Sequence, residues 1–186
     1  MIFKNLTALC RAHKRIWLYD DPAGVQWVSE GGAIYPLHGL PRMTGESLPY
    51  VFDVPDKDLG KYSIKQEDRL PGYFCYQDVG AERKLQPEPI ILRRYDTILC
   101  PVQTSRGLMF YNPDYLKPLR DLRDMLEIYE RSTPEGQVYF AVKSGFLLQA
   151  LILPMKVDNV LLLQDLQPIT HALLETVEAS VQAEKE

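Results

Sequence analysis

Two stretches of the sequence, residues 25–41 and 138–154, share a pattern that limits the folds open to the chain. Each starts with strand-forming residues, passes through a turn containing glycine and ends on Leu-Pro. This pattern predicts a strand–turn–strand unit. Aligned without gaps, the two stretches share the residues Val25 with Val138, Gly32 with Gly145, Leu40 with Leu153, and Pro41 with Pro154. Both units are therefore expected to do the same structural job, and duplication of one segment stays an open interpretation.

Three other segments carry the periodicity of amphipathic helices. Residues 3–14 place their apolar side chains on one face and Lys4, Arg11 and Lys14 on the other. Over 115–131 the pattern predicts a helix with exposed i,i+4 ion pairs, namely Arg120–Asp124, Arg123–Glu127 and Glu127–Arg131. The third segment, from about residue 166 to residue 183, has a narrow apolar stripe. We expect an α+β fold: a mainly antiparallel sheet built from hairpins, with about three amphipathic helices (N-terminal, 115–131 and C-terminal).

The region between Pro36 and Pro89 is dense in proline, glycine and charge. Short strands are predicted at "YVFDV" (50–54) and "GYFCYQ" (72–77), separated by loops that offer a partner-binding segment. One α+β domain over 1–186 is the expected organisation, and a division into 1–89 and 90–186 is the weaker alternative.

Composition limits the classes of function. The net charge of −4 argues against nonspecific nucleic-acid binding by the whole surface, although a local basic face remains open. The longest apolar runs, "FLLQALILP" and "NVLLL", are far shorter than the ~20 residues of a membrane span. Three cysteines at positions 10, 75 and 100 fit reduced thiols better than a disulfide framework. These features predict a cytoplasmic protein without a membrane partner.

The glycine pair Gly31-Gly32 does not fit a phosphate-binding loop. Strand-like residues and Pro36 follow it, so no helix N-terminus is placed to hold a phosphate. His38 lies between prolines in "PLHGLP", where a loop histidine can act as a general base. We find no nucleophile elbow, no metal-ligand spacing and no cofactor motif, and we therefore assign no catalytic residue, metal or cofactor.

Two basic groups are candidates for binding a partner. The first is the N-terminal helix with Arg15 at its end, and the second is "ILRRY", where two arginines precede a tyrosine. Together with His38, the candidate ligand- or partner-binding residues are Lys4, Arg11, Lys14, Arg15, His38, Arg93, Arg94 and Tyr95.

The favoured function is that of a non-enzymatic binding protein that occupies a protein partner or a small anionic ligand. A chain of this size without a recognised motif is typical of phage and mobile-element proteins, and the stripe of the last helix would support a homo-oligomer. One alternative is a DNA-associated protein, because a basic first helix with two hairpin-plus-helix units is similar in layout to a sliding-clamp domain. The other alternative is a hydrolase or nucleotide-modifying enzyme with His38 in its site.

Overall fold

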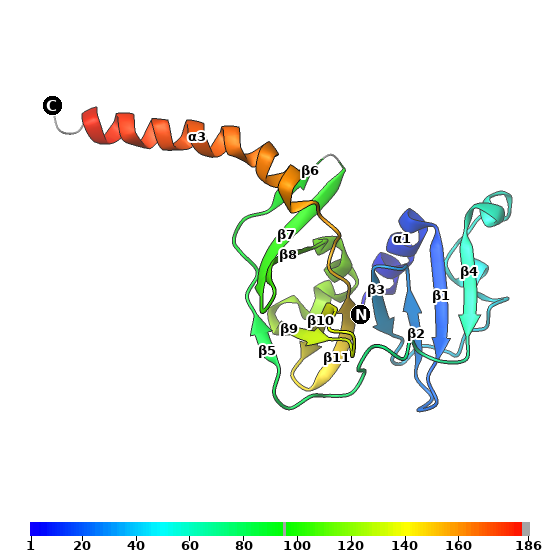
Figure 1. Cartoon of the computed structure of the whole chain (residues 1–186). Helices are drawn as coiled ribbons and strands as arrows, with labels where there is room; N and C mark the ends of the chain where they lie inside the picture. Colours follow the sequence, from blue (N-terminus) through cyan, green and yellow to red (C-terminus); the bar gives the residue numbers. More distant parts are fainter. Residues whose placement is uncertain (95, 184–186) are drawn as a thin grey trace. The chain divides into compact units, whose positions relative to one another are not determined.

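The computed structural model describes residues 1–94 and 96–183. The chain divides into two compact units, Met1–Met155 and Lys156–Glu186. The first unit contains an eight-stranded sheet in the order β4-β1-β2-β3-β11-β10-β9-β5 and a three-stranded sheet in the order β6-β7-β8 (Figure 1). The α+β fold expected from the sequence is therefore confirmed.

The first half of the large sheet is a helix followed by a three-stranded meander. Its elements are α1 (Phe3–His13), β1 (Arg15–Asp20), β2 (Gln26–Ser29) and β3 (Ala33–Pro36), with antiparallel pairing from β1 to β3. Lys14 ends α1 in the left-handed conformation with φ 52°, which turns the chain directly into β1. The chain then forms α2 (Leu48–Val51), the 3₁₀ helix η1 (Asp56–Lys61) and β4 (Ser63–Glu67), which pairs parallel to β1.

The second half repeats the order of helix and meander, but its outer strand comes before the helix in the chain. The 3₁₀ helix η2 (Pro113–Met125) leads into an antiparallel meander of β9 (Leu126–Ser132), β10 (Val138–Ser144) and β11 (Leu147–Ile152). The outer strand β5 (Arg83–Leu85) pairs with β9. Between β5 and η2 lie the strands of the small sheet, β6 (Leu92–Arg94), β7 (Thr97–Thr104) and β8 (Gly107–Tyr111).

The two halves meet where β3 pairs antiparallel with β11, at Ile34 with Leu151 and at Ala33 with Ile152. An antiparallel seam between two helix–strand–strand–strand units gives the sheet an approximate internal two-fold symmetry. Residues 25–41 and 138–154 form β2–β3 and β10–β11, so the similarity between them matches equivalent places in the two halves. Strand–turn–strand geometry is confirmed for both.

Each face of the large sheet buries its own apolar cluster. On one face, α1 and η2 pack side by side, and residues such as Leu6, Leu119 and Phe140 are fully buried in the main core. On the other face, Trp27, Tyr139 and Leu151 form a smaller aromatic-rich cluster. Leu70, Phe74 and Tyr76 pack against this cluster from the loop of residues 68–82, which we call the strap. Period-two alternation along the strands separates the two faces.

Three local predictions differ from the structure. The helical segment predicted over 115–131 ends at Met125, and residues 126–131 belong to β9, because they pair with β10 along its whole length. "YVFDV" forms no strand: Tyr50 and Val51 end the helix α2 (Leu48–Val51), and the next two residues form a turn, with Leu48 and Phe52 buried in the main core. "GYFCYQ" lies in the strap and forms no strand, because its aromatic side chains pack on the sheet face instead of pairing with an edge.

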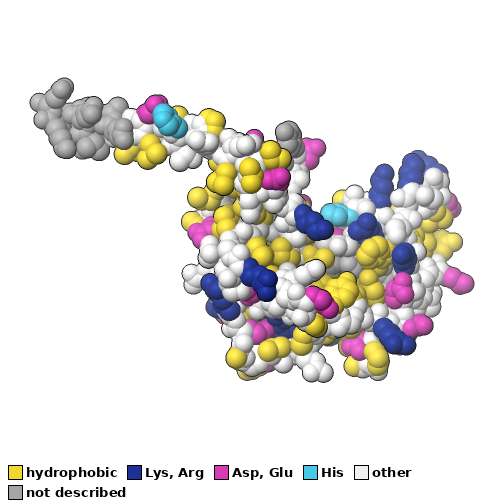
Figure 2. All heavy atoms as spheres, in the orientation of Figure 1, with side chains coloured by type: hydrophobic (Ala, Val, Ile, Leu, Met, Phe, Trp, Pro, Cys, Tyr) yellow, Lys and Arg dark blue, Asp and Glu magenta, His cyan; other side chains and the backbone are white. Residues whose placement is uncertain are grey.

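The second unit contains α3 (Asn159–Ala183), which begins earlier than the sequence pattern predicted. The Asp158 carboxylate accepts hydrogen bonds from the N–H groups of Val160 and Leu161 at 3.0 and 3.1 Å and so caps its first turn. Hydrophobic side chains are exposed along much of α3 (Figure 2), including Leu163 and Leu173. No helix in the described part of the chain is long and apolar enough to cross a membrane.

Candidate binding groove

A groove of about 590 Å³ lies between η2, β9 and β5 in the first unit. Its apolar floor includes Leu85 and Ile128, which are buried in the main core, and Leu116 and Leu126, which are half-buried. The charged side chains of its wall are four basic residues and one acid: Lys84, Lys117, Arg120, Arg123 and Glu127. A volume of this size is in the range of small-molecule and peptide sites, which combine an apolar surface with a few polar groups.

The 3₁₀ geometry of η2 explains why the basic side chains stand in one row. A 3₁₀ helix has three residues per turn, so side chains at i and i+3 lie directly above one another. Lys117, Arg120 and Arg123 are spaced by three and form the basic row, while Leu116 and Leu119 belong to the neighbouring apolar row. Thirteen residues is long for a 3₁₀ helix. Asn112 starts it by accepting a hydrogen bond from the Asp114 N–H at 2.9 Å.

Two of the four basic side chains in the groove wall have no carboxylate partner among the described residues. Lys84 pairs with Glu127, and Lys117 Nζ lies 2.9 Å from Asp114 Oδ1. Arg120 and Arg123 are exposed and have no ion-pair partner among residues 1–94 and 96–183. The i,i+4 pairs predicted for them do not form, because side chains four apart do not face each other on a 3₁₀ helix and Glu127 lies on β9. The groove therefore presents two uncompensated guanidinium groups beside an apolar floor.

A second polar cluster surrounds Glu30 in the turn between β2 and β3. The Glu30 side chain is fully buried and accepts hydrogen bonds from the N–H groups of Gly32 at 2.7 Å and Ala33 at 2.6 Å. His13 Nδ1, at the end of α1, lies 3.6 Å from Glu30 Oε2. Tyr115 of η2 packs so closely on Gly32 that no side chain fits there. The cluster joins the β2–β3 turn to both helical segments.

Burial dominates the acid–base properties of this cluster. It raises the pKa of the Glu30 carboxyl from 4.5 to about 7, although hydrogen bonds from Gly32 and Ala33 and the charge of Arg15 act in the opposite direction. Burial also lowers the pKa of His13, with a further lowering by Arg15 and an opposing contribution from Asp114. Perturbed groups of this kind often mark functional sites, but both Glu30 oxygens are occupied by backbone N–H groups. Its geometry supports a structural role in the turn.

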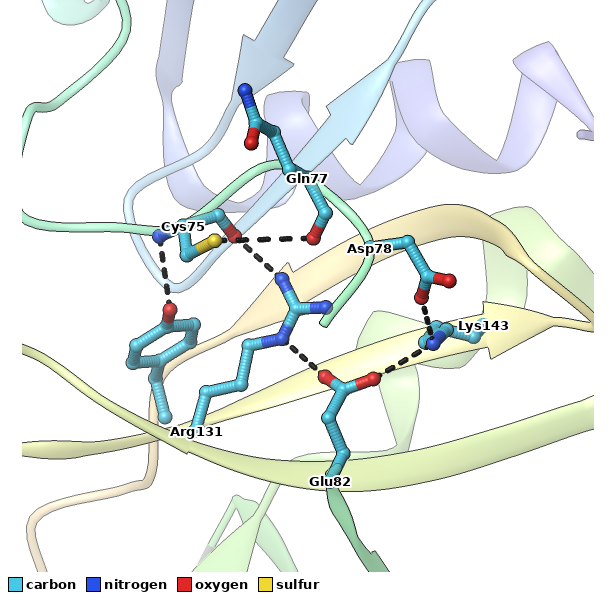
Figure 3. A network of polar contacts seen from close by, with 7 residues as sticks. Cys75, Gln77, Asp78, Glu82, Arg131 and Lys143 are labelled. Atoms are coloured by element: carbon cyan, nitrogen blue, oxygen red, sulfur yellow. Dashed lines mark hydrogen bonds and ion pairs between the residues drawn. The ribbon is translucent and has the colours of Figure 1, made fainter. Parts of the chain in front are cut away.

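A third cluster fastens the strap to the sheet (Figure 3). Arg131 of β9 and Lys143 of β10 both pair with Glu82, at the end of the strap, and Lys143 also pairs with Asp78. The carbonyl oxygen of Cys75 accepts a hydrogen bond from Arg131 Nη1 at 2.6 Å. Arg131 Nη2 is buried without a hydrogen-bond partner among the described residues. Two buried cations are thus neutralised mainly by carboxylates from one loop.

The residues that the sequence indicated as a basic face do not act together in the structure. Lys4 and Lys14 are exposed, but Arg11 Nη1 lies 2.8 Å from Asp53 Oδ2 and is already paired. The Arg15 guanidinium stacks 4.6 Å from the centre of the Trp17 ring, on β1. On the face shown in Figure 2, Lys and Arg side chains are interspersed with Asp and Glu. DNA binding through α1 stays a prediction.

His38 and the "ILRRY" segment lie elsewhere in the first unit. His38 is exposed and lines a hollow of about 200 Å³ with Arg42, so a catalytic role for it stays a prediction. Arg93 is exposed on β6. The side chain of Arg94 and all of Tyr95 lie outside the described residues. None of Lys4, Arg11, Lys14, Arg15, His38 or Arg93 lines the groove.

Sequence reasoning missed the groove because its wall comes from two distant segments. The sequence contained one usable signal, which is the spacing of three between Lys117, Arg120 and Arg123. On the predicted helix, Arg120 and Arg123 are expected in i,i+4 pairs on the exposed side. Lys84 and Leu85 join the groove only through the pairing of β5 with β9.

Comparison of the chain with protein families, with curated proteins and with solved structures finds no match. The described residues contain no group of three or more His, Cys, Asp or Glu side chains placed to hold a metal ion. The groove must therefore be interpreted from its own chemistry.

Proposed function

We propose that this chain is a binding protein that holds an anionic ligand with an apolar part in the groove between η2, β9 and β5. The observation that carries the proposal is the pair Arg120 and Arg123, which stand without carboxylate partners among the described residues at the side of an apolar floor. An exposed arginine can remain hydrated, but two aligned guanidinium groups favour a carboxylate, sulfonate or phosphate. An apolar group that covers the floor would contribute binding free energy of roughly 25 cal/mol per Å² of apolar surface buried.

The proposal can be tested with 1-anilinonaphthalene-8-sulfonate, an amphipathic anion whose fluorescence rises in an apolar site. We expect saturable binding to the full chain. Removing both guanidinium groups with Arg120→Gln and Arg123→Gln is expected to weaken that binding by about tenfold or more, because charge-assisted hydrogen bonds are lost.

A matched control distinguishes the groove from general electrostatic attraction. Lys57 and Arg69 are exposed and do not line the groove, so Lys57→Gln with Arg69→Gln removes the same charge elsewhere. This control is expected to bind the sulfonate like the unaltered chain. Equal weakening in both double variants, or no weakening in either, would refute the groove as the anion site.

A further inference from the structure

The symmetry of the large sheet indicates what kind of ligand the groove is shaped for. In the first half, the position between the helix and the outer strand is filled by the chain itself. The segment of residues 43–54 lies there, and its Leu48 and Phe52 side chains are fully buried in the main core. The rings of Phe52 and Phe3 of α1 meet edge to face, with centroids 5.4 Å apart. Two apolar side chains four residues apart thus anchor this segment.

Polar contacts hold the same segment at both sides. The Asp53 carboxylate accepts a hydrogen bond from Arg11 Nη1 of α1 at 2.8 Å. At the other side, the Gly45 N–H donates to Gln66 Oε1 of β4 at 2.6 Å. The segment therefore spans from the helix to the outer strand, with an acid bound by a helix arginine.

In the second half η2 and β9 are the equivalent elements, and β5 takes the outer place, although it runs antiparallel to β9 whereas β4 runs parallel to β1. These three elements line the groove, and Pro87, Tyr111 and Pro113 line it as well. The helix arginine also has a counterpart: Arg11 lies four residues before the start of β1, and Arg123 lies three residues before the start of β9. The difference is that Arg11 has Asp53 as its partner, whereas Arg123 has none among the described residues.

We infer that the groove binds an acidic peptide segment of a partner protein, which occupies the second half as residues 43–54 occupy the first. Such a segment would place two apolar side chains four residues apart on the apolar floor and a carboxylate against Arg123, with Arg120 beside it. The pattern is that of Leu48, Phe52 and Asp53 in the chain itself. This inference rests on the proposed function, and it names the chemical class of the ligand.

The test uses a synthetic peptide with the sequence of residues 44–55, TGESLPYVFDVP, blocked at both ends and carrying a fluorescent label. Its anisotropy is titrated with the full chain. We expect saturable binding that competes with the sulfonate probe and is weakened about tenfold or more by Arg120→Gln with Arg123→Gln. Lys57→Gln with Arg69→Gln should leave it unchanged. Peptides carrying Phe52→Ala or Asp53→Asn should each bind more weakly than the parent, because each loses one of the two kinds of anchor.

The outcomes separate the two proposals. If the sulfonate binds at the two arginines but the peptide neither binds nor displaces it, the peptide inference is overturned and the proposed function stands. If the peptide binds equally well to the arginine variant and to its control, the inference also fails. If neither the sulfonate nor the peptide depends on Arg120 and Arg123, both proposals fall.

Discussion

Glu30 provides the sharpest prediction about the stability of the first unit. Its carboxyl has a pKa of about 7 in the folded chain against 4.5 for an unperturbed glutamate. The folded state therefore binds a proton more readily than the unfolded state between these two values. The resulting stability is fully present below about pH 4.5 and is lost as the pH rises through about 7. A difference of this size corresponds to about 3 kcal/mol, because each pKa unit is worth about 1.4 kcal/mol.

The assay is urea unfolding of the full chain at a series of pH values between about 5 and 8, compared with Glu30→Gln. The parent chain is expected to lose up to about 3 kcal/mol of unfolding free energy over this window, or roughly 6–12 °C in melting temperature. Glu30→Gln cannot ionise, so it should not show this loss of stability with rising pH.

The pH dependence of stability that His13 contributes has the opposite sign, so its effect must be measured separately from that of Glu30. Because its pKa is lowered in the folded chain, the stability that it contributes is present above its unfolded pKa of about 6.5 and is lost as the pH falls through its folded pKa. The comparison is therefore made in a His13→Gln background as well. If that background is no less stable at about pH 8 than at about pH 5, or if Glu30→Gln keeps the same pH dependence, the burial argument for Glu30 is wrong.

Two further substitutions test the other clusters. Gly32→Ala should destabilise the chain by about 1–3 kcal/mol in urea unfolding, because the added methyl group would overlap the buried ring of Tyr115. Glu82→Gln should cost about 3–5 kcal/mol and make the strap a preferred site of limited proteolysis, because it leaves the buried cations Arg131 and Lys143 undercompensated.

Matched controls exist for both substitutions. Gly60 has open space where a Cβ would be added, so Gly60→Ala is expected to change stability by less than about 1 kcal/mol. Glu46 is exposed, and Glu46→Gln should have a similarly small effect. A Gly32→Ala chain as stable as Gly60→Ala would contradict the close packing of Tyr115. If the strap is cleaved equally fast in Glu82→Gln and in Glu46→Gln, Glu82 does not hold the strap to the sheet.

The sequence was sufficient to predict the elements that depend on local pattern. The amphipathic α1, the β2–β3 unit and the β10–β11 hairpin follow from periodicity and turn residues, which are properties of neighbouring positions. The helix ending at Met125 was extended too far because Leu126 continues the apolar stripe of 115–131. In the structure the residues from Leu126 onward belong to β9, because pairing with β10 outweighs helix propensity.

The candidate site was harder to predict because it depends on tertiary pairing. The pairs predicted for Arg120 and Arg123 assumed 3.6 residues per turn, whereas the structure has three. Lys84 reaches the groove from β5, a strand of three residues that gives no strand pattern inside a region dense in proline, glycine and charge. Nothing in the local sequence around Glu30 indicates that its side chain is fully buried.

The short seam between β3 and β11 has a mechanical consequence. Two residue pairs and a hydrogen bond from the Leu153 N–H to the Gly32 carbonyl at 2.8 Å join these strands, whereas seven residue pairs join β9 to β10, so the backbone ladder is short at the middle of the sheet. Helix contacts bridge the halves instead: the Ile2 N–H donates to the Pro118 carbonyl at 2.6 Å, and the Asn5 side chain donates to the Lys117 carbonyl at 2.8 Å. The first residues of the chain therefore help to hold the two halves together, and the Tyr35 hydroxyl, which donates to the Tyr115 carbonyl at 2.8 Å, adds a further link between them.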